Sequence, residues 1–169
     1  HRLISMFSEH SLSAVGCVRT VSQSEALNSE SKVIEDIVSF GQWDEILNGY
    51  SCVIHLAGRA HVLSDSSNSN IEEFRKVNRD ATLRLAKSAS KGGLKRFIYV
   101  SSIGVLGQSA PMEHAFNNNS IYAPKEPYAI SKMEAEIGLN MISESTEMEV
   151  VIIRPPLVYG PSAPGNFNR

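Results

Sequence analysis

The sequence predicts an α/β protein with a doubly wound parallel sheet, and three observations support this fold class. Segments with strand character alternate with helical segments along the chain, as the crossovers of a parallel sheet require. The strand-like segments are apolar on both faces, which is typical of parallel strands covered by helices on both sides. No internal repeat or linker divides the 169 residues, so we expect one domain over residues 1–169.

The first half of the chain supplies three of the expected strands. In order, we expect the end of a helix through about Glu9, a strand at 12–18, a strand at 32–37, a short helix around Trp43 and a strand at 52–56. The stretch from Thr20 to Ser31 is rich in Ser, Glu and Asn, which predicts a surface connection. A second polar stretch, at 64–70, predicts a loop.

The second half of the chain supplies two long helices and two strands. In order, we expect a helix from Ile71 to about Lys91, a strand at 94–100, a long loop at 104–125, a helix from near Pro127 to about Ser143 and a strand at 148–153. Gly92 and Gly93 are expected to end the first of these helices. Proline suits the first turn of the second, where a helix leaves its N–H groups unpaired. Both helices are expected on the same face of the sheet.

The composition excludes several broad classes of protein. Hydrophobic residues make up 42% of the chain and charged residues 20%, and the net charge is −2. This balance is ordinary for a soluble globular protein and gives no electrostatic case for nucleic acid. No stretch approaches the roughly 20 apolar residues of a membrane span. Cys17 and Cys52 lie in apolar runs and are expected to be reduced core residues, which fits a cytoplasmic protein. No metal site is expected.

The strongest candidate for chemistry is a tyrosine and a lysine one helical turn apart. Tyr128 and Lys132 lie near the start of the predicted helix, and this spacing places both side chains on one face. A cation beside a phenol lowers the phenol's pKa, which would make Tyr128 a usable general base. Ser102 follows the strand-like run at 96–100, at the strand end where open α/β sheets bind ligands. Its hydroxyl could hydrogen-bond a sugar alcohol or carbonyl.

These residues are part of a longer series of motifs. In chain order the series is Asp36-Ile37, His55-Leu56-Ala57-Gly58, the segment 78–82, Val100-Ser101-Ser102 with Val105-Leu106-Gly107, Tyr128 with Lys132, and Arg154-Pro155-Pro156-Leu157-Val158-Tyr159-Gly160-Pro161. The series covers nearly the whole chain. In this order it resembles the extended short-chain dehydrogenase/reductase family, in its NAD-dependent nucleotide-sugar epimerase/dehydratase branch. The resemblance implies a Rossmann-like sheet.

The resemblance also implies a role for each matching position. Ser102, Tyr128 and Lys132 match the family's catalytic triad. Asn78 matches a helix asparagine that steadies the central sheet. The positions that match cofactor-binding residues are Asp36 and Ile37 at the adenine, Leu56, Ala57 and Gly58 near the ribose and pyrophosphate, Tyr128, Lys132 at the nicotinamide ribose, and Pro155 near the nicotinamide. His61 follows as a loop residue, with solvent contact favoured over substrate contact.

Two departures from the family pattern bear on the cofactor. The glycine-rich turn that seats the pyrophosphate does not appear, and the chain stops where a substrate lobe would begin. We therefore expect a middle piece of a longer enzyme, without the first strand and inactive alone, whose strands at 12–18 and 52–57 flank an empty slot. The cofactor is expected to be NAD, with NADP open, because Arg19 could accept a 2′-phosphate, stack on adenine or lie in solvent.

Three functions remain open on the sequence. Ile103 and Gly104 stand where the family's dehydratases carry an Asp-Glu pair, which makes dehydration unfavourable. The first candidate is 4-epimerisation of a nucleotide sugar, expected to be UDP-linked. The second is NAD(P)H-dependent reduction of a 4-keto sugar, which Leu157 keeps open because many epimerases have Asn there. The third is a catalytically silent binding protein, which the presence of the complete triad argues against. The resemblance further implies a homodimer formed through a four-helix bundle.

Overall fold

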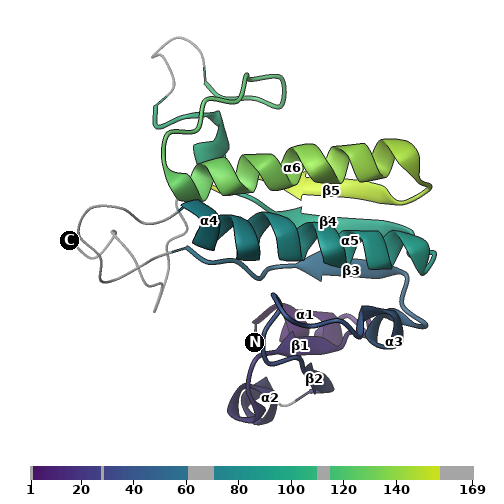
Figure 1. Cartoon of the computed structure of the whole chain (residues 1–169). Coiled ribbons are helices and arrows are strands. Elements are labelled where there is room, and N and C mark those ends of the chain that lie inside the picture. Colours follow the sequence, from purple (N-terminus) through teal and green to yellow (C-terminus); the bar gives the residue numbers. More distant parts are fainter. Residues whose placement is uncertain (1, 28, 61–70, 110–114, 157–169) are drawn as a thin grey trace. The chain divides into compact units, whose positions relative to one another are not determined.

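The computed structural model describes residues 2–27, 29–60, 71–109 and 115–156 of the chain. Figure 1 shows the helices and strands in these ranges. The chain forms two compact units, His1–Gln42 and Trp43–Arg169. Every strand pair in the described residues is parallel. The α/β class with parallel strands is therefore confirmed.

The first unit is a small α/β unit with two strands. Its elements are α1 (Arg2–Glu9), β1 (Gly16–Val18), α2 (Val21–Leu27) and β2 (Ser31–Val33). Strand β1 pairs with β2 in parallel, with Gly16 opposite Ser31. A Cβ atom at Gly16 would lie 2.8 Å from the Leu27 side chain and 2.9 Å from that of Ile4. Glycine is therefore needed where both helices approach this strand.

Helix α2 lies within the expected surface connection at 20–31, where no helix was predicted. The stretch is polar, but Thr20 accepts a 3.3 Å hydrogen bond from the backbone N–H of Gln23 through its hydroxyl oxygen. A threonine that binds the N–H three residues ahead is a helix N-cap. Leu27 packs near Gly16 at the other end of the helix. One cap and one apolar anchor therefore suffice to form a short helix that the composition hides.

The second unit contains a three-stranded parallel sheet. Its elements are α3 (Trp43–Leu47), β3 (Cys52–His55), α4 (Ile71–Phe74), the π-helical segment η1 (Arg75–Ala81), α5 (Thr82–Lys91), β4 (Arg96–Val100), the 3₁₀ turn η2 (Ile103–Leu106), α6 (Pro127–Ser145) and β5 (Glu149–Ile153). The strand order is β3-β4-β5. Arg96 pairs with Cys52 on one side and with Glu149 on the other.

The long helix predicted from Ile71 to Lys91 is present, but its middle segment is π-helical. A π turn contains an extra residue compared with an α turn and often occurs at functional sites. Here the Tyr99 hydroxyl donates a 3.3 Å hydrogen bond to the backbone oxygen of Asn78 within the π segment. The helix ends at Gly92 as predicted, and Gly93 adopts a positive φ of 78°.

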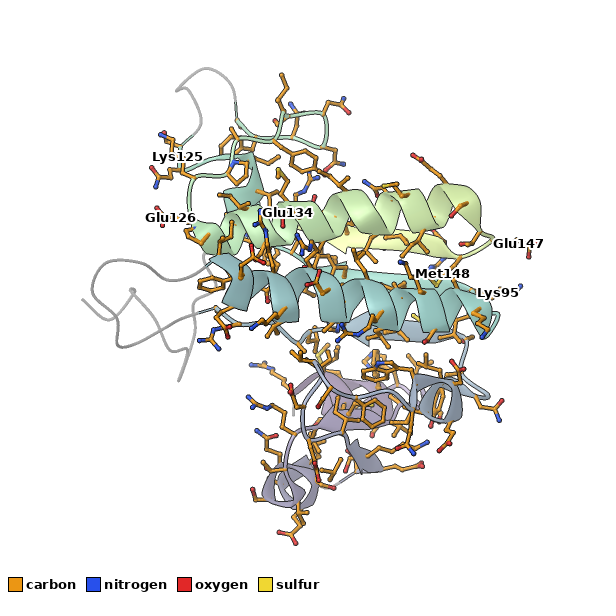
Figure 2. All side chains as sticks on the ribbon, viewed as in Figure 1. Lys95, Lys125, Glu126, Glu134, Glu147 and Met148 are labelled. Carbon is orange, nitrogen blue, oxygen red and sulfur yellow. The ribbon has the colours of Figure 1, made fainter. Side chains whose placement is uncertain are left out.

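Both long helices cover the same face of the three-stranded sheet, as predicted (Figure 1). Phe97 and Tyr99 on β4 and Leu139 on α6 are fully buried in this layer. A Cβ atom at Gly138 would lie 2.7 Å from Leu83, so the glycine allows close approach of the two helices. The strands point toward the end where α6 begins, which is the end of Glu126 in Figure 2, whereas Glu147 lies at the other end.

The strands form two separate sheets, so the prediction of a single sheet is wrong for the described residues. Strands β1 and β3 each have one hydrogen-bonded neighbour among the described residues and are therefore edge strands. Cys17 lies on β1 and Cys52 on β3; both are free thiols, but they are exposed and not in the core. The predicted slot beside these strands stays a prediction. No helix in the described ranges is long and apolar enough to span a membrane.

Candidate active site

Tyr128 and Lys132 lie in the first two turns of α6. Glu126 precedes the helix in an extended conformation, and Pro127 occupies its first turn as predicted. The backbone N–H of Ile130 donates a 2.9 Å hydrogen bond to the oxygen of Glu126, which starts the helical ladder. Lys132 is 3% exposed and Tyr128 is half-buried. The start of α6 lies at the carboxyl end of the sheet (Figure 1), and the residues of its first two turns therefore lie at that end.

The ammonium group of Lys132 is held at the end of β4. Its Nζ donates a 3.0 Å hydrogen bond to the backbone oxygen of Val100. The same nitrogen lies 4.6 Å from the centre of the Tyr99 ring and 5.9 Å from that of Tyr128. Burial lowers the pKa of Lys132 to about 8, and the charge of Glu136 opposes this shift. Lys132 is thus a desolvated cation whose charge is easily perturbed.

The expected lowering of the Tyr128 pKa is not found. Burial raises the pKa of Tyr128 above its ordinary value of 10.0. The phenol ring meets Phe74 edge-on at a centroid distance of 6.4 Å, which accounts for part of that burial. Lys132 does not offset the effect of burial, because its ammonium is directed to Val100. The spacing of the pair is visible in the sequence, but the direction in which the ammonium points is not.

Ser102 follows β4 at the same end of the sheet. Its hydroxyl oxygen accepts a 3.1 Å hydrogen bond from the N–H of Gly104, so it caps the turn η2. A Cβ atom at Gly104 would lie 3.4 Å from the Ser102 hydroxyl and 3.6 Å from the Ala129 side chain. Glycine therefore keeps the space between Ser102 and the start of α6 narrow. This contact brings Ser102 to the helix that carries Tyr128 and Lys132.

Asn78, expected to steady the sheet, binds the segment after β3 and also α6, and the bond to α6 was not expected from the sequence. Its side-chain oxygen accepts a 2.8 Å hydrogen bond from the N–H of Arg59. Its amide nitrogen donates to the Arg59 oxygen at 3.1 Å and to the Ser131 hydroxyl at 3.0 Å. Ser131 in turn donates to the backbone oxygen of Tyr128 at 2.7 Å. The fully buried asparagine therefore fixes the segment after Gly58 against α6.

His55 is a buried neutral imidazole behind this site. Its Nε2 shares a 2.9 Å hydrogen bond with the Thr82 hydroxyl, and its ring stacks on Tyr99 at 5.8 Å. Burial and the charge of Lys132 lower the pKa of His55 to about 3. A neutral histidine under the lysine adds no competing positive charge. His55 therefore supports the packing behind Lys132 without titrating near neutral pH.

A second buried cluster was also missed from the sequence. Glu136, one turn beyond Lys132, is fully buried and accepts hydrogen bonds from Arg154 and from the Tyr122 hydroxyl. A carboxylate at a core position of a helix requires a cationic partner. The repeat of polar residues at every fourth position of α6, with an arginine closing β5, is the sequence signal that could have found it.

The structure separates the remaining predicted cofactor-binding residues into two groups. Arg19, Asp36 and Ile37 lie in the first unit, where Arg19 is exposed and the Asp36 side chain caps its own turn through a 3.0 Å bond from Val38 N–H. The second group lies in the second unit and comprises Leu56, Ala57, Gly58 and Pro155. Leu56 is 60% exposed, so its apolar side chain is accessible at the end of β3.

Some predicted positions cannot be placed. His61, the loop at 64–70 and the motif at 157–161 lie outside the described residues. Within the described ranges, no group of three or more His, Cys, Asp or Glu side chains is arranged to hold a metal ion.

Comparison with known proteins gives consistent matches. A sequence model of the NAD dependent epimerase/dehydratase family matches residues 2–169. The UDP-glucose 4-epimerase of Vibrio cholerae is 40% identical over 134 residues, which cover 79% of this chain and 41% of that protein. The dTDP-D-glucose 4,6-dehydratase of Mus musculus is 39% identical over 109 residues, covering 64% of this chain and 30% of that protein.

The fold also matches solved structures. The UDP-glucuronic acid 4-epimerase from Bacillus cereus, in complex with NAD, superposes with a TM-score of 0.78 and 21% identity, over 95% of this chain and 53% of that one. At this identity the likeness supports the Rossmann-like fold alone. The chain thus spans 41% of the epimerase's length in the sequence comparison and about half of the matched structure.

Proposed function

The chain belongs to the NAD dependent epimerase/dehydratase family, and from this premise we propose that the whole protein is a nucleotide-sugar 4-epimerase that uses tightly bound NAD. One observation carries the proposal. Ser102 approaches the start of α6 across Gly104, and the same helix carries Tyr128 and Lys132 at the carboxyl end of the sheet. A hydroxyl, a phenol and an ammonium at this edge suit proton transfer at a sugar hydroxyl.

The residues around the site fit a nicotinamide cofactor. A Cβ atom at Gly58 would lie 3.1 Å from Lys132 Nζ and 3.3 Å from the Asn78 side-chain oxygen. Glycine at this position leaves room for a ribose beside the ammonium. The exposed Leu56 offers an apolar surface that a bound cofactor would cover. When bound, NAD would supply the hydride acceptor and donor that epimerisation needs.

Each side chain of the site would have a separate role in the reaction. Lys132 has three N–H donors, and the bond to Val100 uses one, which leaves donors for ribose hydroxyls. Tyr128 would move the proton of the sugar hydroxyl through its phenol oxygen. Because burial raises its pKa, the phenolate needs the Lys132 charge nearby during the reaction. Ser102 would hydrogen-bond the sugar oxygen and keep it at the phenol.

Dehydration is not supported by the site, although a dehydratase is among the relatives. Ile103 and Gly104 lie in η2 directly after Ser102, and neither side chain can transfer a proton. The remaining alternative is the reduction of a 4-keto sugar, which the sequence favours only through Leu157.

We further propose a UDP-linked substrate, a homodimer and a cytoplasmic location for the whole protein. The names of the two epimerases above give UDP-sugars as their substrates. On α6, Ile137 and Met141 lie one turn apart and are 43% and 63% exposed. Two exposed apolar side chains on one face of a helix support packing against a second copy.

The test uses the whole protein with UDP-glucose or UDP-N-acetylglucosamine and no added reductant. An epimerase converts the sugar at C4 with no net change in cofactor absorbance. Activity confined to a 4-keto sugar, with stoichiometric loss of NAD(P)H, would replace this proposal by the reductase. No turnover of any nucleotide sugar would favour a silent binding protein.

A further inference from the structure

We propose that Glu136, Arg154 and Tyr122 form a positioning cluster around the buried Glu136 carboxylate, and that this cluster holds Ser102 in place relative to Tyr128 and Lys132. The proposal rests on the proposed function, because it assigns the cluster a part in that reaction. The proposal assigns none of the three residues a contact with the reacting atoms. They act through the backbone segments and the helix that they join.

The three side chains of the cluster are all hydrogen-bonded to one another. Arg154 donates to the Glu136 carboxylate through Nε at 3.1 and 3.2 Å and through Nη2 at 2.7 Å. The Tyr122 hydroxyl donates to Glu136 at 2.8 Å and accepts from Arg154 Nη2 at 3.1 Å. The guanidinium also lies 5.2 Å from the centre of the Tyr122 ring. Three side chains from a loop, a helix and a strand end therefore share one closed set of bonds.

Backbone hydrogen bonds link the segment of Arg154 to that of Ser102. The oxygen of Ile153, just before Arg154, accepts a 2.8 Å hydrogen bond from the N–H of Ser101. The oxygen of Pro155, just after it, accepts a 3.0 Å bond from the N–H of Ile103. Both backbone neighbours of Ser102 are thus bound to both neighbours of Arg154. Any shift of Arg154 would move the segment that carries the Ser102 hydroxyl.

Helix α6 links Glu136 to the other two catalytic candidates. Tyr128, Lys132 and Glu136 follow one another at single-turn spacing on α6. The cluster therefore ties the helix of Tyr128 and Lys132 to the strand end of Ser102. The loop that carries Tyr122 is also held to η2, because the N–H of Ala123 donates a 3.0 Å bond to the oxygen of Val105.

The energetics favour positioning over stabilisation alone. The Glu136 side chain is fully inaccessible and that of Arg154 is 19% exposed. Replacing a buried ion pair by apolar residues is often neutral or stabilising, because desolvating two charges offsets their attraction. A pair of this kind fixes geometry more reliably than it adds stability. Its bidentate, charge-assisted bonds fix the orientation of the guanidinium.

The test compares three variants of the whole protein at a temperature well below every measured Tm. Glu136→Gln breaks the ion pair, and Glu136→Leu combined with Arg154→Met replaces it by apolar side chains. Glu134→Gln is the matched control, because Glu134 also lies on α6 and pairs with Arg75 and Arg79 outside the site (Figure 2). The readouts are kcat and KM on the UDP-sugar, Tm, and amide hydrogen exchange in the peptide 98–106.

A positioning cluster gives a specific pattern of results. Glu136→Gln lowers kcat by about 10- to 100-fold, as small misplacements of catalytic groups do, and changes KM little. Glu136→Gln also speeds amide hydrogen exchange in peptide 98–106. Glu134→Gln changes neither kcat nor this exchange rate. The double variant Glu136→Leu/Arg154→Met recovers the Tm of the wild type but not its kcat.

Other results would overturn the proposal. If the double variant recovers kcat together with Tm, the cluster serves stability only. If exchange in peptide 98–106 is the same in Glu136→Gln and wild type, the link to Ser102 does not exist. Absence of turnover in the wild type would refute the proposed function instead, and the exchange measurement would still decide on the link.

Discussion

Gly58 and Lys132 lie so close together that a methyl group on Gly58 would press against the ammonium. A Cβ atom at Gly58 would be 3.1 Å from Lys132 Nζ, on the side of the lysine where we place the cofactor ribose. Gly58 is held there because the next residue, Arg59, is bound on both backbone groups by Asn78. The turn after β3 and the start of α6 therefore build one site together.

The first prediction concerns this close approach. Gly58→Ala in the whole protein should weaken NAD binding and lower kcat by roughly 10-fold or more, because the lysine must give way. Gly41→Ala is the control, since a Cβ atom at Gly41 meets nothing within 4 Å. Titration with NAD, followed by fluorescence, measures the change. Equal affinities of the two variants would contradict the proposed place of the ribose.

The second prediction concerns the phenol. Tyr128→Phe removes one oxygen and keeps the edge-on contact with Phe74, so the fold should be retained. Loss of a general acid–base group costs about 10²–10⁴-fold in rate. The kcat of the variant, compared with its Tm and circular dichroism, tests this. Wild-type turnover in Tyr128→Phe would rule out both the epimerase and the reductase.

The third prediction concerns the pH dependence of stability. Burial lowers the pKa of Lys132 from 10.5 to about 8, whereas the unfolded chain has the ordinary value. Between these values the unfolded state binds more protons, so the free energy of unfolding rises with pH in this window. The native state thus bears a cost on the order of 3 kcal/mol at pH 7 that fades toward pH 10.5.

Lys132→Met removes this cost. The cofactor-free variant should have the higher Tm at pH 7, and its advantage should shrink between pH 8 and 10 as the wild-type lysine loses its proton. Thermal melts of both proteins at a series of pH values give the difference. An advantage that does not change with pH would mean that the lysine is not desolvated in the native state.

The fourth prediction concerns assembly. Ile137→Glu combined with Met141→Glu places two charges on the exposed face of α6 and should convert the proposed dimer to a monomer. Val21→Glu is the control, because Val21 and Met141 are equally exposed, at 63%. Light scattering gives the mass of each. A dimer that persists in the double variant would place the interface elsewhere.

The sequence predicted the parts of the fold that depend on local patterns. Pro127, Gly92 and the apolar runs correctly indicated helix ends and parallel strands. It missed α2, because a polar composition hides the cap at Thr20. It also missed the π-helical segment, which makes tertiary hydrogen bonds through Asn78 to Tyr99, Arg59 and Ser131. Contacts between distant residues leave no periodic signal.

In the candidate site, too, local sequence patterns predicted correctly and long-range contacts were missed. The helical spacing correctly predicted that Tyr128 and Lys132 lie at the start of one helix. The strand-like run before Ser102 correctly predicted that this serine follows a strand. The direction of the Tyr128 pKa was wrong, because the lysine's hydrogen-bond partner is a backbone oxygen distant in sequence. The pairing of Glu136 with Arg154 joins a helix to a strand end, and their sequence separation concealed it.

The most direct test of the central claim follows a deuterium atom. The whole protein is incubated with UDP-glucose that carries deuterium at C4, and the product is analysed by NMR. Our account predicts inversion at C4 with the deuterium retained on carbon, because hydride leaves and returns within one site while Tyr128 moves only the hydroxyl proton. Inversion with loss of the deuterium to water would contradict it.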